Sequence, residues 1–127
     1  MESPKISVVM SVYNGAPFVR EAIESVLNQT FEDFEFIIFD DKSLDASATI
    51  IRSNPDARIR FFENAENVGL TKNLCRGMEI AKGEYVARMD ADDVCLPERF
   101  ERQARFLDAH PEISALGSAV YFFKDAG

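Results

Sequence analysis

The sequence predicts an α/β domain in which helices cover both faces of a mainly parallel, Rossmann-like sheet. Short apolar runs alternate with amphipathic segments along the chain, which is the order typical of such folds. The runs are nearly continuously apolar, as expected for strands that are buried on both faces. Clusters of polar residues follow several of these runs. With 127 residues, of which 46% are hydrophobic and 28% charged, the chain fits a single domain with one core.

The first strand is expected at residues 6–10, where Ile, Val and Met predominate. It ends in a turn at 11–15, because Asn14 and Gly15 favour turns. Pro17 then suits the first turn of a helix. Apolar side chains recur at helical spacing after it, and the helix is expected to end near residues 28–30.

The second and third strands are expected at residues 34–39 and 59–62. A short helix at 46–53 connects them, although its residues are poor in strong helix formers. Ser43 or Asp45 is expected to cap this helix, and the Asn-Pro-Asp sequence that follows breaks it.

An amphipathic helix is expected at residues 70–82, followed by a fourth strand at 84–89. The expected core-facing stripe of this helix consists of Leu70, Leu74, Met78 and Ala81. Lys82 is expected in the last turn, and Gly83 at a left-handed C-cap. Cys75 is interpreted as a buried small hydrophobe.

The last elements are a helix that Pro97 opens and a strand at residues 113–123 with a break at Gly117. His110 is interpreted as a helix-end residue without a catalytic role, since this end of a helix favours a cation. The aromatic residues of the third strand and of 121–123 are interpreted as core or interface residues.

Polar side chains directly follow the first, second and fourth strands. Parallel strands joined by right-handed crossovers share one carboxyl edge, so these side chains are expected to meet there. They are Ser11, Tyr13, Asn14, Asp40, Asp41, Asp90, Asp92 and Asp93. Ligands of open α/β sheets bind at this edge where the strand order reverses, which is expected between the first and fourth strands.

Three carboxylates, those of Asp90, Asp92 and Asp93, lie within four residues at the end of the fourth strand. Like charges this close repel, so a cation among the oxygens explains the cluster, and Mg²⁺ or Mn²⁺ suits such ligands. A solvated acidic turn is the alternative, because a short motif match is weak evidence. The convergence of other polar residues on the same edge favours a functional site.

The chain shows neither a nucleotide P-loop nor a dinucleotide fingerprint, since no Gly-rich turn follows the first strand. A phosphate group would then be held by the metal and by a cation such as Lys72, Arg76 or Arg88. This combination indicates a metal-dependent transferase whose leaving group is a nucleoside diphosphate.

The composition excludes some partners. A formal net charge of −8 argues against non-specific nucleic-acid binding, which needs a basic surface. Cys75 and Cys95 form neither a metal-ligand pattern nor a disulfide framework, which indicates a reducing, cytoplasmic setting. No apolar run approaches transmembrane length. An anchor in a longer parent protein would place the domain at the inner face of a membrane.

Several motifs occur in order along most of the chain. They are SVVMSVYNG at 7–15, SVLNQTF at 25–31, DDKS at 40–43, NVGL at 67–70, GEYV at 83–86, DADD at 90–93 and PERF at 97–100. Together they resemble the family 2 glycosyltransferases of the GT-A fold. The resemblance implies inverting transfer of a sugar from a nucleotide-diphosphate donor, usually a UDP- or dTDP-sugar, to a hydroxyl of a saccharide or lipid-linked acceptor. Its commonest setting is polysaccharide biosynthesis at the bacterial surface.

The resemblance also implies roles for individual residues. Ser11 and Tyr13 match the positions that contact the nucleotide, with the tyrosine stacking on the base. Asp41 matches a carboxylate that accepts a hydrogen bond from uracil. Asp90 matches the carboxylate near the ribose or a metal-bound water, and Asp92 matches the metal ligand.

Other positions are less closely defined by the resemblance. Asp93 is a candidate for contact with the sugar or the metal, and Lys72 for contact with a phosphate. Lys72 and Asn73 stand where many relatives carry Ala-Arg-Asn, so the role of this helix start is open. The family's catalytic base lies well beyond the Asp-x-Asp motif, and Glu112 and Asp125 are too close to match it. Residues 1–127 are therefore expected to be the amino-terminal, donor-binding part of a longer enzyme whose base lies beyond residue 127.

Two other functions stay open. A nucleotidyltransferase also uses an Asp-rich metal site, although a Gly-rich basic loop after the first strand would then be expected. A non-catalytic nucleotide-binding or oligomerisation module is the other, because an exposed sheet edge invites pairing with a second copy. For single residues, Tyr13 has the alternative role of covering the core rim, and Asp40 is expected to bond to Ser43.

Overall fold

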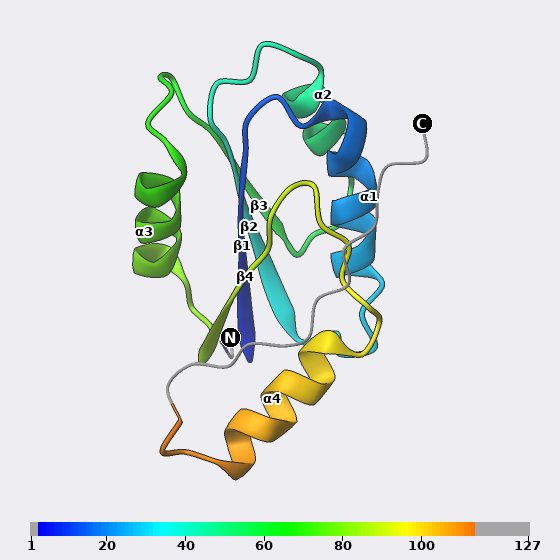
Figure 1. Ribbon diagram of the computed structural model, residues 1–127, viewed down its shortest axis with the longest axis vertical. Helices are drawn as coiled ribbons and strands as arrows, with labels where there is room; N and C mark the ends of the chain where they lie inside the picture. Colours follow the sequence, from blue (N-terminus) through cyan, green and yellow to red (C-terminus); the bar gives the residue numbers. More distant parts are fainter. Residues whose placement is uncertain (1–2, 114–127) are drawn as a thin grey trace.

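The computed structural model describes residues 3–113, which contain a four-stranded parallel sheet and four helices (Figure 1). In chain order the elements are β1 (Ile6–Val12), α1 (Ala16–Leu27), β2 (Phe34–Asp40), α2 (Ser47–Arg52), β3 (Ile59–Glu63), α3 (Leu70–Ile80), β4 (Tyr85–Arg88) and α4 (Arg99–Ala109). This order confirms the expected alternation of strands and helices. The strand expected at 113–123 lies, apart from its first residue, outside the described residues. No helix in the described part combines the length and the apolar composition that a bilayer-spanning helix needs.

The strands lie in the order β3-β2-β1-β4, and all neighbouring pairs are parallel. From β1 the chain runs outward through β2 to β3, and it then returns to the other side of β1 to form β4. The strand order therefore reverses between β1 and β4, as expected. In open α/β sheets this reversal creates the crevice in which ligands bind.

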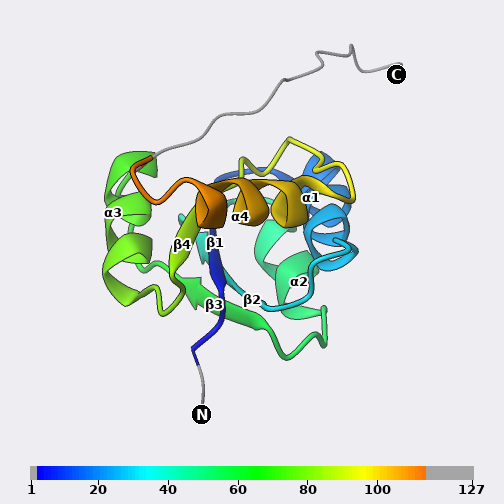
Figure 2. The same ribbon diagram turned by 90° about the horizontal axis from the view of Figure 1, so that it is seen from below.

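Helices cover both faces of the sheet. Figures 1 and 2 show α3 on one face and α1, α2 and α4 on the other. The larger core contains alternate residues of β1 and β2 together with α1 and α4, whereas Val9, Ile37 and Phe39 form a smaller cluster toward α3. Successive side chains of a strand point to opposite faces, so both central strands must be apolar throughout.

The expected apolar stripe of α3 is confirmed only in part: Leu74 and Ala81 pack against the cluster of Val9, Ile37 and Phe39, but the fully buried residues of the helix are different ones. Its buried residues are Asn73 and Gly77, whereas Leu70 and Met78 are 45% and 64% exposed. Gly77 explains this choice of face, because a Cβ atom at that position would lie 2.5 Å from Val9 Cγ1. The helix approaches β1 so closely that only glycine fits at the contact.

Three further expectations about α3 are wrong. The helix ends at Ile80, so Lys82 lies beyond its last turn. Gly83 does not adopt a left-handed conformation; it is needed because a Cβ there would lie 2.6 Å from the backbone nitrogen of Ser7. Cys75 is exposed rather than buried, because the helix turns this position away from the sheet.

Neither Ser43 nor Asp45 is the N-cap residue of α2, because Ala46 occupies that position and makes no side-chain capping bond. Asp45 lies one residue earlier and bonds to the first residue of the helix. Asp45 Oδ1 accepts hydrogen bonds from the Ser47 N–H at 2.9 Å and from the Ser47 hydroxyl at 2.6 Å. Ser43 instead donates its hydroxyl to Asp40 Oδ1 at 2.6 Å, which confirms the expected bond between these two residues.

A buried carboxylate at the amino edge of the sheet fixes the connection that leads into β4. Glu35 on β2 accepts hydrogen bonds from the Ser7 hydroxyl, from the Lys82 N–H at 2.7 Å and from Arg60 Nη1 at 2.7 Å. Burial favours a higher pKa for Glu35, but these hydrogen bonds and the Arg60 charge outweigh it and hold the pKa below its ordinary value of 4.5. The segment between α3 and β4 is thereby tied to β1 and β2.

Candidate functional site

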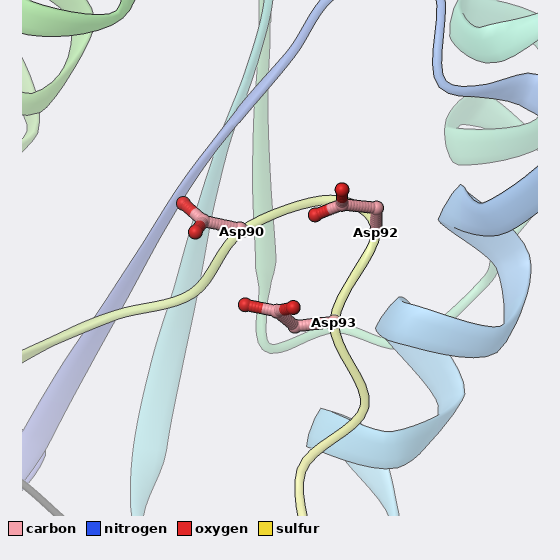
Figure 3. Close-up of side chains that lie close together, drawn as sticks. All are labelled: Asp90, Asp92 and Asp93. Carbon is pink, nitrogen blue, oxygen red and sulfur yellow. The ribbon is translucent and has the colours of Figure 1, made fainter. Parts of the chain in front are cut away.

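The acidic cluster lies in the turn that follows β4. Asp90, Asp92 and Asp93 each offer a carboxylate oxygen, and these oxygens lie within 4.8 Å of one another. All three side chains are open to solvent, and Asp92 and Asp93 direct their carboxylates back toward Asp90 (Figure 3). An all-oxygen set of this kind matches the ligand preference of hard divalent cations.

Buried residues fix both ends of this turn. Met89 and Cys95 are buried, and Cys95 Sγ lies 3.2 Å from Met89 Sδ. The Met89 N–H donates to Val9 O at 3.0 Å, which continues the pairing of β4 with β1. Within the turn, the Asp93 N–H donates to Asp90 O at 3.1 Å. The backbone that carries the carboxylates is therefore held at both ends and closed on itself.

The end of α1 orients the segment that follows the cluster. Gln29 is buried, donates to Leu96 O at 2.7 Å and accepts a hydrogen bond from the Phe100 N–H at 3.0 Å. Ser25 Oγ accepts a hydrogen bond from the Cys95 N–H at 3.0 Å. These contacts give the SVLNQTF motif a physical role, since its polar side chains bind the chain just after the acidic turn.

Electrostatic repulsion remains within the cluster. Burial and then the charges of Asp90 and Asp92 raise the pKa of Asp93 above its ordinary value of 3.8, and the Arg99 guanidinium opposes this only in part. Arg88 Nη2 lies 3.3 Å from Asp90 Oδ1 in a half-exposed ion pair, which is a weak compensation. A divalent cation would relieve the repulsion that these two arginines leave.

The turns after β1 and β2 are bonded to each other beside the cluster. The Asn14 N–H donates to Ser43 Oγ at 2.9 Å, and Asn14 Oδ1 accepts a hydrogen bond from the Leu44 N–H at 2.8 Å. A Cβ atom at Gly15 would lie 3.7 Å from Ala91 Cβ, so the turn after β1 lies next to the acidic turn. The ends of β1, β2 and β4 therefore meet at one edge, as the sequence predicts.

Ser11 and Tyr13 lie at the end of β1, on the side of the acidic turn. Tyr13 is 51% exposed, so about half of its surface is open to solvent. Ser11 is partly buried, and its Oγ accepts a hydrogen bond from Asn73 Nδ2 at 2.9 Å. The structure thus brings these two residues and the three aspartates to the shared carboxyl edge of β1 and β4.

Asp41 lies at the end of β2, but it is only 2% exposed. Its Oδ1 accepts hydrogen bonds from the Val68 N–H at 2.9 Å and from Asn64 Nδ2 at 3.0 Å, and its Oδ2 accepts one from the Gly69 N–H at 2.9 Å. Burial favours a raised pKa for Asp41, but these donors outweigh it and lower the pKa below 3.8. Asp41 is an ionised side chain that holds the loop between β3 and α3.

Lys72 lies apart from the acidic turn. It is exposed on the first turn of α3 and lines a hollow of about 440 Å³ together with Asn64, Val68, Asn73 and Arg76. None of the three clustered aspartates lines this hollow. The structure therefore groups Lys72 with the loop that Asp41 holds.

Sequence reasoning gave Asn64 no role and left the role of Asn73 open; in the structure these two residues connect Asp41 to Ser11. Asn64 Nδ2 donates to Asn73 Oδ1 at 2.8 Å, and Asn73 is 1% exposed. The available signal was the spacing of Asn73 and Gly77, which places two small or polar residues on one face of an otherwise amphipathic helix. That face packs on the sheet.

Comparisons with known proteins identify the family. Residues 7–127 match the family model described as glycosyl transferase family 2. The chain belongs to glycosyltransferase family 2. It is 39% identical over 131 aligned positions to an uncharacterised glycosyltransferase of Methanocaldococcus jannaschii. This alignment covers 100% of the chain and 45% of that relative. An uncharacterised glycosyltransferase of Haemophilus influenzae is 36% identical over 117 positions, which cover 91% of this chain and 36% of that protein. The chain spans less than half the length of these curated relatives.

Solved structures of glycosyltransferases share the fold. S. aureus TarS in complex with UDP-GlcNAc superposes with a TM-score of 0.79 at 28% identity, over 84% of this chain and 32% of TarS. The Pyrobaculum calidifontis mannosyltransferase PcManGT in complex with GDP-Man and Mn²⁺ superposes with a TM-score of 0.69 at 26% identity, over 82% of this chain and 31% of that enzyme. The α/β sheet of this family 2 member is thus of the GT-A type.

Proposed function

We propose that this family 2 member transfers a sugar from a UDP- or dTDP-sugar to an acceptor hydroxyl with inversion, and that residues 1–127 bind the donor. The observation that carries the proposal is the position of the acidic cluster. Its three carboxylates lie at the reversal of strand order, beside Ser11 and the exposed ring of Tyr13. The complexes of TarS with UDP-GlcNAc and of PcManGT with GDP-Man support a nucleotide-sugar donor.

The proposed metal is Mn²⁺ or Mg²⁺, with Asp92 and Asp90 as its protein ligands. The residues fit such an ion, because their oxygens lie within 4.8 Å of one another and face solvent, where substrate oxygens and water can complete the shell. When bound, the ion supplies a Lewis acid that stabilises negative charge on a departing diphosphate. Asp93 is proposed to contact the sugar or the metal shell. The Mn²⁺ in PcManGT supports the assignment.

The nucleotide contacts are proposed to come from the neighbouring strand ends. Tyr13 offers an exposed ring for stacking on the base, and Ser11 offers a hydroxyl. An ionised carboxylate has about four acceptor positions, and three of those on Asp41 are used by the protein. The remaining position, on Oδ2, is proposed to accept the imide N–H of uracil. Lys72 is proposed to contact a phosphate from the adjacent hollow.

The acceptor is proposed to be a saccharide or a lipid-linked saccharide. We place the catalytic base in the part of the longer relatives to which this chain does not align. Residues 1–127 then bind and orient the donor, and deprotonation of the acceptor hydroxyl requires a carboxylate from elsewhere.

Isothermal titration calorimetry with UDP, in the presence and absence of Mn²⁺, tests the donor and metal assignments. UDP is expected to bind more tightly with Mn²⁺, and Asp92→Ala is expected to abolish the effect of Mn²⁺. Asp33→Ala, which removes an exposed carboxylate next to β2, is the matched control and should behave as wild type. Equal, metal-independent binding in wild type and Asp92→Ala would contradict the metal assignment.

Asp41→Asn tests recognition of the base. The variant is expected to bind UDP more weakly while its affinity for inorganic pyrophosphate, measured with the same metal, stays near that of wild type. An equal loss for both ligands would remove the base-recognition role from Asp41.

A further inference from the structure

A chain of four polar side chains runs from the end of β2 to the end of β1 by way of α3. Its members, in order, are Asp41, Asn64, Asn73 and Ser11. Asn64 Nδ2 donates to Asp41 Oδ1 at 3.0 Å and to Asn73 Oδ1 at 2.8 Å, and Asn73 Nδ2 donates to Ser11 Oγ at 2.9 Å. The bonds join three elements that are far apart in sequence, since Ser11 and Asn73 are 62 residues apart.

The negative charge of Asp41 sets the direction of every bond in this chain. An ionised carboxylate only accepts hydrogen bonds, so the Asn64 amide must turn its nitrogen toward Asp41. The same nitrogen faces Asn73, so Asn73 must present its oxygen to Asn64. The nitrogen of Asn73 then faces Ser11, and Ser11 Oγ must accept. The reverse orientation of either amide would place two donors or two acceptors against each other.

Ser11 is therefore left with one hydrogen to donate. Its oxygen accepts from Asn73, and within residues 3–113 its hydroxyl donates to no protein acceptor. Asn73 is 1% exposed, so solvent cannot compete with this bond. A hydroxyl held in this way, at the carboxyl end of β1, is suited to an oxygen acceptor on a ligand.

We propose that Asn73 is a positioning residue that makes the Ser11 hydroxyl a donor toward an acceptor oxygen of the bound nucleotide. This inference rests on the proposed function, in which Ser11 contacts the nucleotide. It adds that Ser11 donates the hydrogen bond in this contact and that Asn73 fixes this direction. In this proposal Asn73 acts on the nucleotide through Ser11, and its side chain also interacts with Asp41.

A double-mutant cycle tests the proposal, with the dissociation constant of UDP in the presence of Mn²⁺ as the readout. Ser11→Ala and Asn73→Ala are each expected to raise the dissociation constant of UDP by about tenfold, the effect of losing one oriented hydrogen bond. Asn73→Ala in the Ser11→Ala background is expected to change the affinity by less than about twofold, because coupled residues are not additive. Additive losses would overturn the proposal, since they would show that Asn73 shapes the site independently of Ser11.

Two further variants separate hydroxyl polarity from folding. Asn73→Asp keeps the shape of the side chain, but at pH 8 the introduced carboxylate accepts hydrogen bonds from both Asn64 and Ser11. The Ser11 hydroxyl must then donate its hydrogen to this carboxylate and not to the ligand, so UDP binding should fall as in Ser11→Ala. Ser11→Thr keeps the hydroxyl and should retain most of the affinity. Wild-type affinity in a folded Asn73→Asp protein would overturn the proposal, with circular dichroism confirming the fold.

The controls distinguish this inference from the function on which it rests. Ser7→Ala removes another β1 hydroxyl at the opposite edge of the sheet, and it should lower stability without weakening UDP. If the wild-type chain binds neither UDP nor dTDP with Mn²⁺, the proposed function fails and the inference fails with it. If wild type binds UDP and the cycle is additive, only the role of Asn73 is overturned.

Discussion

Among single residues, Asp41 holds the loop between β3 and α3 against the end of β2. It receives two backbone N–H groups from the loop before α3 and a side-chain donor from Asn64, and the left-handed Gly69, with a φ of 94°, presents one of these N–H groups. A buried carboxylate is stable only when donors replace its lost hydration. The buried carboxylate of Asp41 is therefore stable only with the donors of this loop, and the loop keeps its conformation through its hydrogen bonds to Asp41.

Asp41→Asn is expected to destabilise the protein at pH 7 by about 1–3 kcal/mol, because the amide turns an NH₂ group toward at least one donor and leaves it unsatisfied. Urea unfolding followed by circular dichroism measures the loss. Asp33→Asn makes the same substitution at an exposed position and should stay within about 0.5 kcal/mol of wild type. Equal stability of the two variants would show that the loop does not depend on this carboxylate.

Among the elements, α3 contributes most to the organisation of the site. It contacts β1 through Gly77, supplies Asn73 to Ser11, and begins directly after the loop that Asp41 holds. The connection from its end to β4 is bonded to Glu35. A shift of this helix would therefore disturb both the loop beside Asp41 and the strand that leads to the acidic turn.

Gly77→Ala is expected to destabilise the fold by about 1–3 kcal/mol, the usual cost of forcing extra volume into a close-packed contact. The added Cβ would lie 2.5 Å from Val9 Cγ1, which the helix can relieve only by moving away from the sheet. Thermal unfolding measures the effect. Met78→Ala, on the exposed side of the same helix, is the control and should change stability by less than about 0.5 kcal/mol. A neutral Gly77→Ala variant would argue against close packing of α3.

Glu35→Gln is expected to lose stability in a pH-dependent way. The folded-state pKa of Glu35 lies below its ordinary value of 4.5, so its stabilising contribution is complete above pH 4.5 and disappears as the pH falls through the folded-state value. Urea unfolding between pH 7 and pH 3 should therefore show a gap between wild type and Glu35→Gln that closes in acid. The exposed Glu32→Gln control should remain close to wild type at pH 7. A gap that does not narrow at any pH below 4.5 would contradict this assignment for Glu35.

The whole molecule is a family 2 member that spans less than half the length of its curated relatives, and its described residues contain the complete reversal of strand order. The proposed donor contacts all come from the ends of β1, β2 and β4 and from α3. Within residues 3–113, β3 and β4 are the edges of the sheet. Pairing of a second copy at such an edge stays a prediction, and light scattering of the purified chain tests it.

The isolated chain is expected to bind donors but to transfer little sugar, because the proposed base lies outside it. Mass spectrometry of UDP release and glycosylated product, over a panel of UDP- and dTDP-sugars with Mn²⁺ and saccharide acceptors, measures this. A matched sample of Asp92→Ala provides the background. Robust, Asp92-dependent transfer would show that the chain contains its own catalytic base.

The sequence by itself determined the α/β class, the order of the elements and the polar residues at the strand ends. These follow from local patterns: continuous apolar runs, helical spacing and turn residues, each of which depends on near neighbours in the chain. The motifs shared with family 2 glycosyltransferases also marked Ser11, Tyr13, Asp41 and the acidic turn.

Only the tertiary structure decided which face of α3 is buried and how the polar residues are bonded. Of the predicted stripe, Leu74 and Ala81 pack on the sheet, whereas Leu70 and Met78 are exposed because the helix contacts Val9 through Gly77. No local pattern encodes the distance between a helix and a strand. The chain from Asp41 to Ser11 likewise depends on side chains up to 62 residues apart. A hydrogen bond forms only between atoms that folding brings within about 3 Å, so its partners and its direction are properties of the assembled fold.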